Sequence, residues 1–155
     1  PSENIDLVIK PLLDSGDLSA STLMIAIHSW SEMLDPNICK VVVDNVGRAL
    51  YFTRAPLPYN RDHGCVDKSK VDNEVGANQM IFGYKHIGVY AYRKSFLLKF
   101  SNMKTSRLEN TEKLEQLRIL ENGYSIQVVE TKQNSIGVDQ PNDLDRIIKN
   151  MNGGQ

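Results

Sequence analysis

The chain has 155 residues, the size of one domain or of a large piece of one. Hydrophobic residues make up 41% of it and charged residues 24%, as in ordinary globular proteins. Eighteen Lys and Arg against nineteen Asp and Glu give a net charge of -1. The chain therefore lacks the excess of positive charge by which proteins bind nucleic acids or anionic membranes. No apolar run reaches membrane-spanning length and no signal peptide opens the chain. We therefore expect no nucleic-acid partner and no membrane insertion, although a few cations could still bind a small anion.

The cysteines and the first residue bear on where the protein works. Cys39 and Cys65 are too few for a disulfide framework or a four-cysteine zinc site. We expect both to be free thiols in a reducing compartment, which favours the cytoplasm. Because the first residue is Pro1, we expect either a processed chain or one that begins inside something larger.

The first half of the chain alternates helical and strand patterns. Residues 4–14 are expected to be helical, and the apolar run 22–27 predicts a strand that is buried on both faces. Residues 40–43 and 49–53 flank a turn that contains Gly47, so they predict a hairpin. Residues 55–80 are polar and weakly periodic, which indicates an excursion from the core.

The second half returns to regular patterns. Strand alternation over 86–92 places His86, Gly88 and Tyr90 on one face of the strand. The remaining expected elements are a short helix over 94–101, a longer one over 106–122 that opens with a capping box, a strand over 126–130 and a last helix over 141–151. This alternation of strands and helices predicts an α/β layer structure.

Generic motifs do not identify the chemistry. The sequence contains no Walker A loop, no GxGxxG, no HExxH and no GxSxG. His28, His63 and His86 lack the spacing of metal ligands. By motif alone the chain is an anonymous α/β domain.

The expected helix over 106–122 carries a polar cluster. At about 100° per residue, Glu115 and Gln116 lie on the side of Glu112, opposite the apolar Leu114 and Leu117. A solvated helix face explains this pattern. A sugar-binding surface explains it too, because carboxylates and amides accept hydrogen bonds from hydroxyl groups.

Five sequence blocks in order carry a resemblance to a known family. They are residues 40–44 (KVVVD), 49–56 (ALYFTRAP) running on to 59–62 (YNRD), 85–93 (KHIGVYAYR), 114–123 (LEQLRILENG), and 137–139 (GVD) with Pro141, Asp143 and Leu144. Together these blocks resemble 3-deoxy-manno-octulosonate cytidylyltransferase, the CMP-Kdo synthetase family of lipopolysaccharide biosynthesis.

The resemblance implies a fold and also a missing part. The expected fold is a three-layer mixed sheet of the nucleotide-sugar transferase (Rossmann-like) type. The family's glycine- and arginine-containing phosphate loop and its acidic metal-binding loop should lie before Pro1. Residues 1–155 would then be the C-terminal sugar-binding and dimerisation portion of a homodimeric enzyme, with a dimer arm at 56–82. This portion alone is expected to be inactive.

The resemblance also implies a reaction and a set of site residues. The intact enzyme would join CTP and Kdo into CMP-Kdo and release pyrophosphate with the help of Mg²⁺, as the sugar's anomeric hydroxyl attacks the α-phosphorus. Asp139 would be the catalytic residue and magnesium ligand of this portion. The substrate-binding residues would be Arg54, His86, Tyr90, Glu115 and Gln116.

Several alternatives remain open at this stage. The chain could belong to another nucleotide-sugar synthetase, such as a CMP-sialate synthetase, or be a non-catalytic dimeric fragment. His86 and Tyr90 could simply be a satisfied core histidine and a stacked tyrosine. The roles of Arg61, Tyr92, Glu112 and Arg118 are not decided by the sequence.

Overall fold

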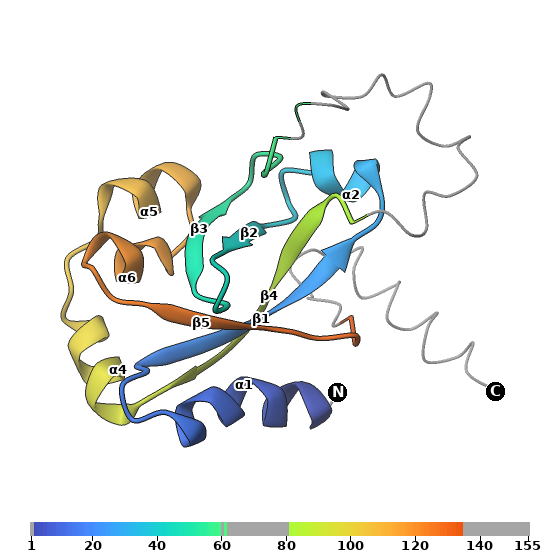
Figure 1. Ribbon diagram of the computed structural model, residues 1–155. Coiled ribbons are helices and arrows are strands. Elements are labelled where there is room, and N and C mark those ends of the chain that lie inside the picture. Colours follow the sequence, from blue (N-terminus) through green and yellow to red (C-terminus); the bar gives the residue numbers. More distant parts are fainter. Residues whose placement is uncertain (1, 60, 62–80, 135–155) are drawn as a thin grey trace, which may run out of the picture.

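A computed structural model describes residues 2–59, 61 and 81–134. In chain order its elements are α1 (Ser2–Asp14), β1 (Ala20–Ile27), α2 (Trp30–Leu34), β2 (Lys40–Val43), β3 (Ala49–Thr53), β4 (Gly83–Tyr92), α4 (Lys94–Ser101), α5 (Arg107–Glu112), α6 (Leu117–Glu121) and β5 (Ile126–Glu130). Helix α1 covers one face of the sheet, and α4, α5 and α6 gather on the other side (Figure 1). This is the expected three-layer α/β fold with a mixed sheet.

The five strands are ordered β3-β2-β4-β1-β5. β1 is antiparallel to β4 and parallel to β5, and its residues are almost all buried, as the apolar run over 22–27 predicts. β2 and β3 form the expected antiparallel hairpin. Its turn needs Gly47, because the backbone there has φ +79° and a Cβ would lie 2.7 Å from the Gln127 amide nitrogen.

Strand β4 has an irregularity in its pairing with β1 and is only partly paired with β2. The register with β1 shifts between Thr22 and Leu23, so that Tyr90 faces Thr22 while Ile87 faces Leu23. The Thr22 hydroxyl fills this bulge and lies 2.9 Å from the Val89 carbonyl and 3.2 Å from the Ile87 carbonyl. On the other edge, β2 pairs with β4 only at Lys85 and Tyr84. Within the described residues, the edge beyond His86 is therefore not covered by a strand.

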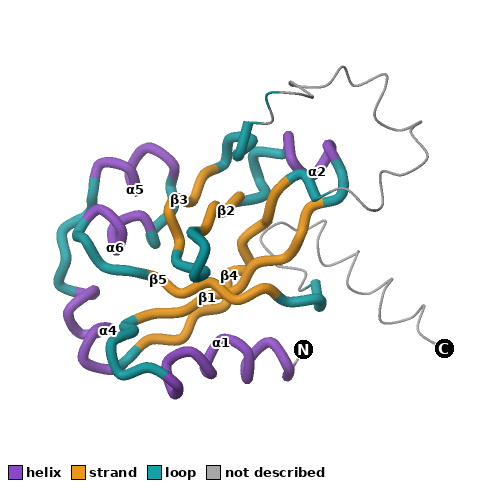
Figure 2. The backbone as a smooth tube through the Cα atoms, viewed as in Figure 1, coloured by secondary structure: helices purple, strands orange, loops and turns teal. Residues whose placement is uncertain are grey.

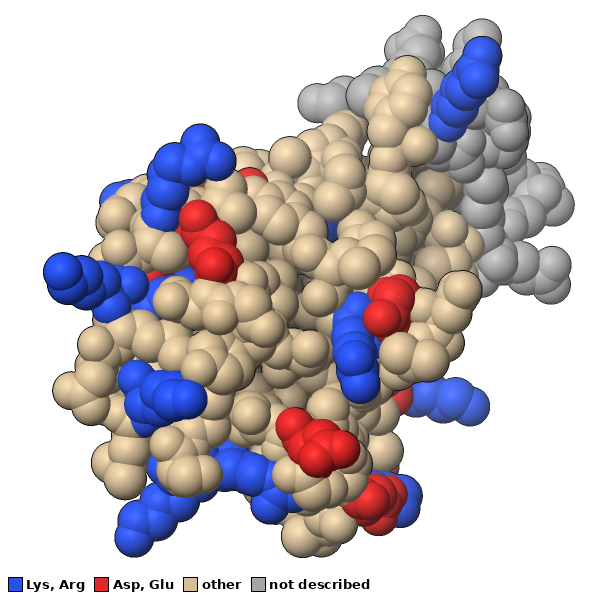
Figure 3. All heavy atoms as spheres, turned by 60° about the vertical axis from the view of Figure 1, so that its left-hand side comes forward, with Lys and Arg blue, Asp and Glu red and all other residues tan. Residues whose placement is uncertain are grey.

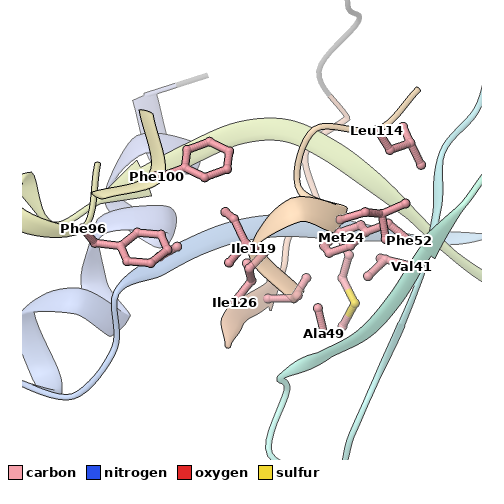
Figure 4. Close-up of a cluster of buried hydrophobic side chains, with 12 residues drawn as sticks. Met24, Val41, Ala49, Phe52, Phe96, Phe100, Leu114, Ile119 and Ile126 are labelled. Atoms are coloured by element: carbon pink, nitrogen blue, oxygen red, sulfur yellow. The ribbon is translucent and has the colours of Figure 1, made fainter. Parts of the chain in front are cut away.

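Two apolar clusters lie on opposite faces of the sheet. The tube in Figure 2 shows α1 on one side of the strands and α4, α5 and α6 on the other. Val8 of α1 packs on Leu23 and Ile87 on one face. The larger cluster on the other face joins strands and helices α4 to α6 (Figure 4): Met24, Val41, Ala49, Phe52, Phe96, Phe100, Leu114, Ile119 and Ile126 are labelled there. The β4 alternation agrees with the prediction, because Ile87 faces α1 while Tyr92 packs in the larger cluster.

The single helix expected over 106–122 is wrong. Glu109 caps the start of α5, because its carboxylate accepts the Ser106 backbone N–H at 3.1 Å, but α5 ends at Glu112 and α6 begins only at Leu117. Lys113 between them adopts the left-handed conformation, with φ 56°. Such a residue costs about 1–2 kcal/mol outside glycine, so tertiary contacts must hold the break. Those contacts are made by Glu112 and are described below.

Some expectations fall outside the described residues. They are the helix over 141–151, Asp139, His63, Cys65 and most of the proposed dimer arm at 56–82. Among the described residues, no helix combines the length and the apolar character that a membrane crossing requires.

Candidate functional site

A pocket of about 580 Å³ opens between the end of β4, helix α4 and the segment that leads into α6. Its lining residues are Tyr90, Tyr92, Leu97, Phe100, Ser101, Glu115, Gln116 and Arg118. The volume lies in the range typical of small-molecule sites. The lining combines aromatic faces with hydroxyl, carboxylate and amide groups.

Aromatic rings form one wall of the pocket. Tyr90 and Tyr92 are stacked with 5.5 Å between ring centroids and 9° between planes, and Tyr92 stacks in turn on Phe100 at 6.0 Å. Burial, with a smaller effect of the Glu115 charge, raises the pKa of Tyr92 to about 12. Both hydroxyls therefore keep their protons at neutral pH and can donate hydrogen bonds, because burial raises the pKa of Tyr90 as well.

The Tyr90 hydroxyl has no hydrogen-bond partner among the described residues, although the oxygen itself is buried. Thr22 is near enough to affect the pKa of the phenol, but it does not complete a hydrogen bond to the Tyr90 oxygen. A buried hydroxyl without a partner costs about 1–3 kcal/mol. Tyr90, which lines the pocket, therefore carries a buried hydroxyl that no described residue satisfies.

Charged side chains form a paired cluster at the pocket's polar side. Arg118 donates two hydrogen bonds to Glu109, at 2.8 and 2.6 Å, and one at 3.2 Å to Glu115. These bonds hold the pKa of Glu109 below its ordinary value. The Nη1 of Arg118 donates to the Met103 carbonyl at 3.2 Å. Two carboxylates against one guanidinium leave this side negative, so it suits hydroxyl groups rather than an acid group.

Gln116 enters the pocket as a buried side chain with 9% exposure. Its amide nitrogen donates to the Cys39 sulfur at 3.8 Å. Burial raises the pKa of the Cys39 thiol to about 11, so the sulfur is an uncharged, weak acceptor. With its nitrogen bound in this way, the amide oxygen of Gln116 is available to accept a hydrogen bond.

His86 lies next to this wall without lining the pocket. Its ring is 5.3 Å from that of Tyr90, and its Nε2 is 2.9 Å from the Thr22 hydroxyl. Burial lowers the pKa of His86 to about 4, so the imidazole is neutral. His86 thus has a hydrogen-bond partner, as expected of a satisfied core histidine. The Tyr90 hydroxyl has none among the described residues.

Arg54 also lies outside the pocket lining. Its Nε donates to the Glu112 carbonyl at 2.9 Å, and its Nη1 donates to the Pro36 carbonyl at 3.0 Å. Arg54 follows β3 directly, as the sequence indicates, but two of its guanidinium nitrogens donate to carbonyls of the protein itself, at the end of α5 and at Pro36. Arg61 is exposed.

Three of the five predicted substrate-binding residues thus meet at one pocket: Tyr90, Glu115 and Gln116. The sequence left Tyr92 and Arg118 undecided, and it missed Leu97, Phe100 and Ser101. The i, i+2 spacing from Tyr90 could have indicated that Tyr92 lies on the same face of the strand. The i, i+3, i+4 spacing of Leu97, Phe100 and Ser101 marks one face of α4, but nothing in the sequence indicates that this face meets β4.

The expected magnesium ligand is not among the described residues. Asp139 lies outside the described residues, and the part of the chain that the structure does describe has no group of three or more His, Cys, Asp or Glu side chains placed to hold a metal ion. The pocket's own carboxylate, Glu115, is paired with Arg118 instead.

Figure 3 turns the side of the molecule with α4, α5 and α6 toward the viewer. Cationic and acidic side chains are interspersed on this face among uncharged residues, and the described part shows no field of a single sign. A site on this side must therefore recognise its ligand by local hydrogen bonds rather than by a broad electrostatic field.

Comparisons with known proteins agree with the fold. The cytidylyltransferase family matches residues 1–131. The chain is 46% identical over 147 residues to a 3-deoxy-manno-octulosonate cytidylyltransferase of Geotalea uraniireducens, covering 95% of this chain and 57% of the relative. It is 49% identical over 142 residues to the protein of that name from Pelobacter propionicus, covering 92% and 54%.

A solved structure of CMP:2-keto-3-deoxy-manno-octonic acid synthetase complexed with CTP has the same fold. It superposes with a TM-score of 0.81 at 32% identity, over 99% of this chain and 57% of that one. The chain therefore spans about half the length of the relatives that it matches. Because the family match covers residues 1–131, most of the chain, the protein is a member of the cytidylyltransferase family.

Proposed function

We propose that this chain is the sugar-binding part of an enzyme that activates Kdo as CMP-Kdo. The reaction uses CTP, releases pyrophosphate and serves lipopolysaccharide biosynthesis. Relatives at 46% and 49% identity bear the name of that enzyme, which favours Kdo over the sialic acid of related synthetases. In the nucleotidyl transfer, the protein contributes mostly positioning and electrostatics.

The pocket composition is the observation that carries this proposal. A hydroxyl-rich ligand needs acceptors, donors and an aromatic surface, and the pocket supplies them from β4, α4 and the segment that leads into α6. Gln116 offers an amide oxygen, Glu115 keeps one carboxylate oxygen beyond its bond to Arg118, and Tyr90 offers the unpartnered hydroxyl. These groups would bind the hydroxyls of Kdo.

The acid group of Kdo would bind elsewhere. The Glu109, Glu115 and Arg118 cluster is negative and repels a carboxylate. Arg54 is the better partner, because its Nη2 makes no hydrogen bond to other described residues and a guanidinium binds carboxylates well. His86 would support the sugar by holding the Tyr90 side of β4 in place.

Three further features complete the proposal. Asp139 would hold Mg²⁺, which offsets charge on the CTP phosphates, together with acidic residues of the intact enzyme. The intact enzyme would be a homodimer, with residues 56–82 as part of the interface. We expect it to work in the cytoplasm, where CTP is made.

A titration of this chain with Kdo tests the sugar-binding claim. Replacing Gln116 by Ala removes one hydrogen bond to the ligand and should weaken Kdo binding by about 1–3 kcal/mol in isothermal calorimetry. Gln127→Ala is the matched control, because the Gln127 amide bonds the Val46 carbonyl outside the pocket. Equal losses in both variants, or tighter binding of sialic acid than of Kdo, would contradict the proposal.

Tyr90→Phe gives a second, independent arm of the same test. Removing a buried hydroxyl that lacks a partner should leave the free chain as stable as before or raise its free energy of unfolding by about 1 kcal/mol. Kdo binding should nevertheless weaken. A variant that binds Kdo normally would remove Tyr90 from the site.

A further inference from the structure

Glu112 makes the contacts that end helix α5. Its carboxylate accepts hydrogen bonds from the Thr53 hydroxyl at 2.7 Å, the Arg54 backbone N–H at 2.9 Å and the Tyr51 hydroxyl at 3.5 Å. Its own carbonyl accepts from Arg54 Nε at 2.9 Å. Four bonds thus tie this one residue to the end of β3.

The Glu112 carboxylate is charged in this setting. Burial alone would raise its pKa, but the bonds from Arg54, Thr53 and Tyr51 together with the Arg54 charge outweigh burial and lower it. Hydrogen bonds to a charged acceptor are among the stronger ones. The tie to β3 is therefore strong enough to hold a left-handed residue directly after it.

The segment that follows leads straight into the pocket. After Lys113, Leu114 turns into the core with 7% exposure, and Gln116 reaches the pocket while its nitrogen bonds Cys39. Leu117, at 0% exposure, fixes the far end of the segment. The placement of Glu115 and Gln116 therefore depends on two anchors, Glu112 on β3 and Leu117 in the core.

We propose that Glu112 is a positioning residue of the pocket, which acts on a ligand only through Glu115 and Gln116. It does not line the pocket itself. If the tie is lost, residues 113–116 can relax toward a continuous helix, and the Gln116 oxygen moves away from its place. This inference rests on the proposed sugar-binding function.

Two carboxylates of the same helix pair allow a matched comparison. Glu112→Gln keeps the size of the side chain but removes its charge. Glu121→Gln makes the same change at a carboxylate that accepts the Leu108 backbone N–H at 2.9 Å and therefore ties α6 to α5 without touching residues 113–116. Kdo affinity and the NMR signals of the Gln116 side-chain amide are measured for both variants and for the unmodified chain.

We expect Glu112→Gln to weaken Kdo binding by about tenfold, the usual effect of one lost charged hydrogen bond, and to shift the Gln116 amide signals. Glu121→Gln should change neither. If Glu112→Gln does not fold, Thr53→Val removes one donor to the same carboxylate and should give the same pattern in weaker form. No shift of the Gln116 amide, or equal effects of Glu112→Gln and Glu121→Gln, would overturn the inference. If the unmodified chain does not bind Kdo, the proposed function fails, while the amide signals still decide the role of Glu112.

Discussion

At the scale of single residues, His86 shows how a buried side chain can affect stability without contacting the pocket. The Thr22 hydroxyl has one proton, and its short contact with the Val89 carbonyl uses that proton, because a carbonyl can only accept. The imidazole Nε2 must then carry the ring proton and donate it to Thr22. The result is a neutral histidine whose protonation the fold resists.

This arrangement predicts a pH dependence of stability. The pKa of His86 is about 4 in the folded chain, below its ordinary value of 6.5, so the unfolded chain binds the proton first as pH falls. Between about pH 7 and about pH 5 this should lower the free energy of unfolding by about 2 kcal/mol. His86→Gln should lack that loss in urea unfolding at both pH values, while the other histidines affect both proteins alike. Parallel pH profiles would show that His86 titrates normally.

The sequence predicts the place of a site residue on its own strand better than it predicts the contacts that the residue makes in the folded chain. Tyr90 was found from strand alternation and the family resemblance, and it does line the pocket. Arg54 was placed correctly at the end of β3, but its bonds to Glu112 and Pro36 could not be foreseen. Those partners lie 58 and 18 residues away in sequence and meet only in the folded chain.

At the scale of elements, Arg93 links α1 to the sheet. It follows β4, and its guanidinium donates to the carbonyls of Leu12, Ser15 and Leu18 at distances of 2.6, 2.7 and 2.8 Å. Two of these carbonyls belong to the end of α1 and the turn after it, where helical carbonyls lack partners. One planar side chain thus caps the helix and fixes the loop into β1.

Arg93→Lys should therefore destabilise the chain although it keeps the charge. A lysine cannot reach three carbonyls in a fork, so we expect a loss of about 1–3 kcal/mol in urea unfolding. Lys10→Gln is the contrasting change, because the Lys10–Asp14 ion pair is 71% and 61% exposed and should contribute at most about 1 kcal/mol. Equal stability of Arg93→Lys and the unmodified chain would refute this capping role.

Local patterns predicted some elements well and failed at one. The helix over 94–101 and the strand over 126–130 have the expected bounds, and the hairpin turn forms where Gly47 indicates it. The break at Lys113 could not be predicted, because no glycine or proline marks it. It depends on Glu112 bonding to β3, which periodicity along one helix does not report.

At the scale of the whole molecule, the part of β4 beyond His86 has no paired strand, among the described residues, on the side away from β1. The His86 N–H donates to the Cys39 carbonyl on the β2 side, and after the register shift the Arg93 N–H donates to the Ser19 carbonyl on the β1 side. By strand alternation from these two bonds, the N–H groups of Ile87 and Ala91 point toward β1, whereas those of Tyr90 and Tyr92 point away from it. Among the described residues, no strand pairs with the edge at Tyr90 and Tyr92.

Amide hydrogen exchange should follow this alternation. In this chain alone, the amides of Tyr90 and Tyr92 should exchange at least about tenfold faster than those of Ile87 and Ala91, whose N–H groups lie in the ladder with β1. Exchange is read residue by residue by NMR. Equal protection of all four amides would mean that another segment covers the edge.

The central claim is that the pocket beside this edge binds the hydroxyl groups of Kdo. A crystal structure of this chain with Kdo bound tests it most directly. We expect the sugar between Tyr92 and Gln116, with its hydroxyls in hydrogen-bond contact with Gln116, Glu115 and the Tyr90 oxygen. Kdo bound at another surface, with this pocket holding only solvent, would contradict it.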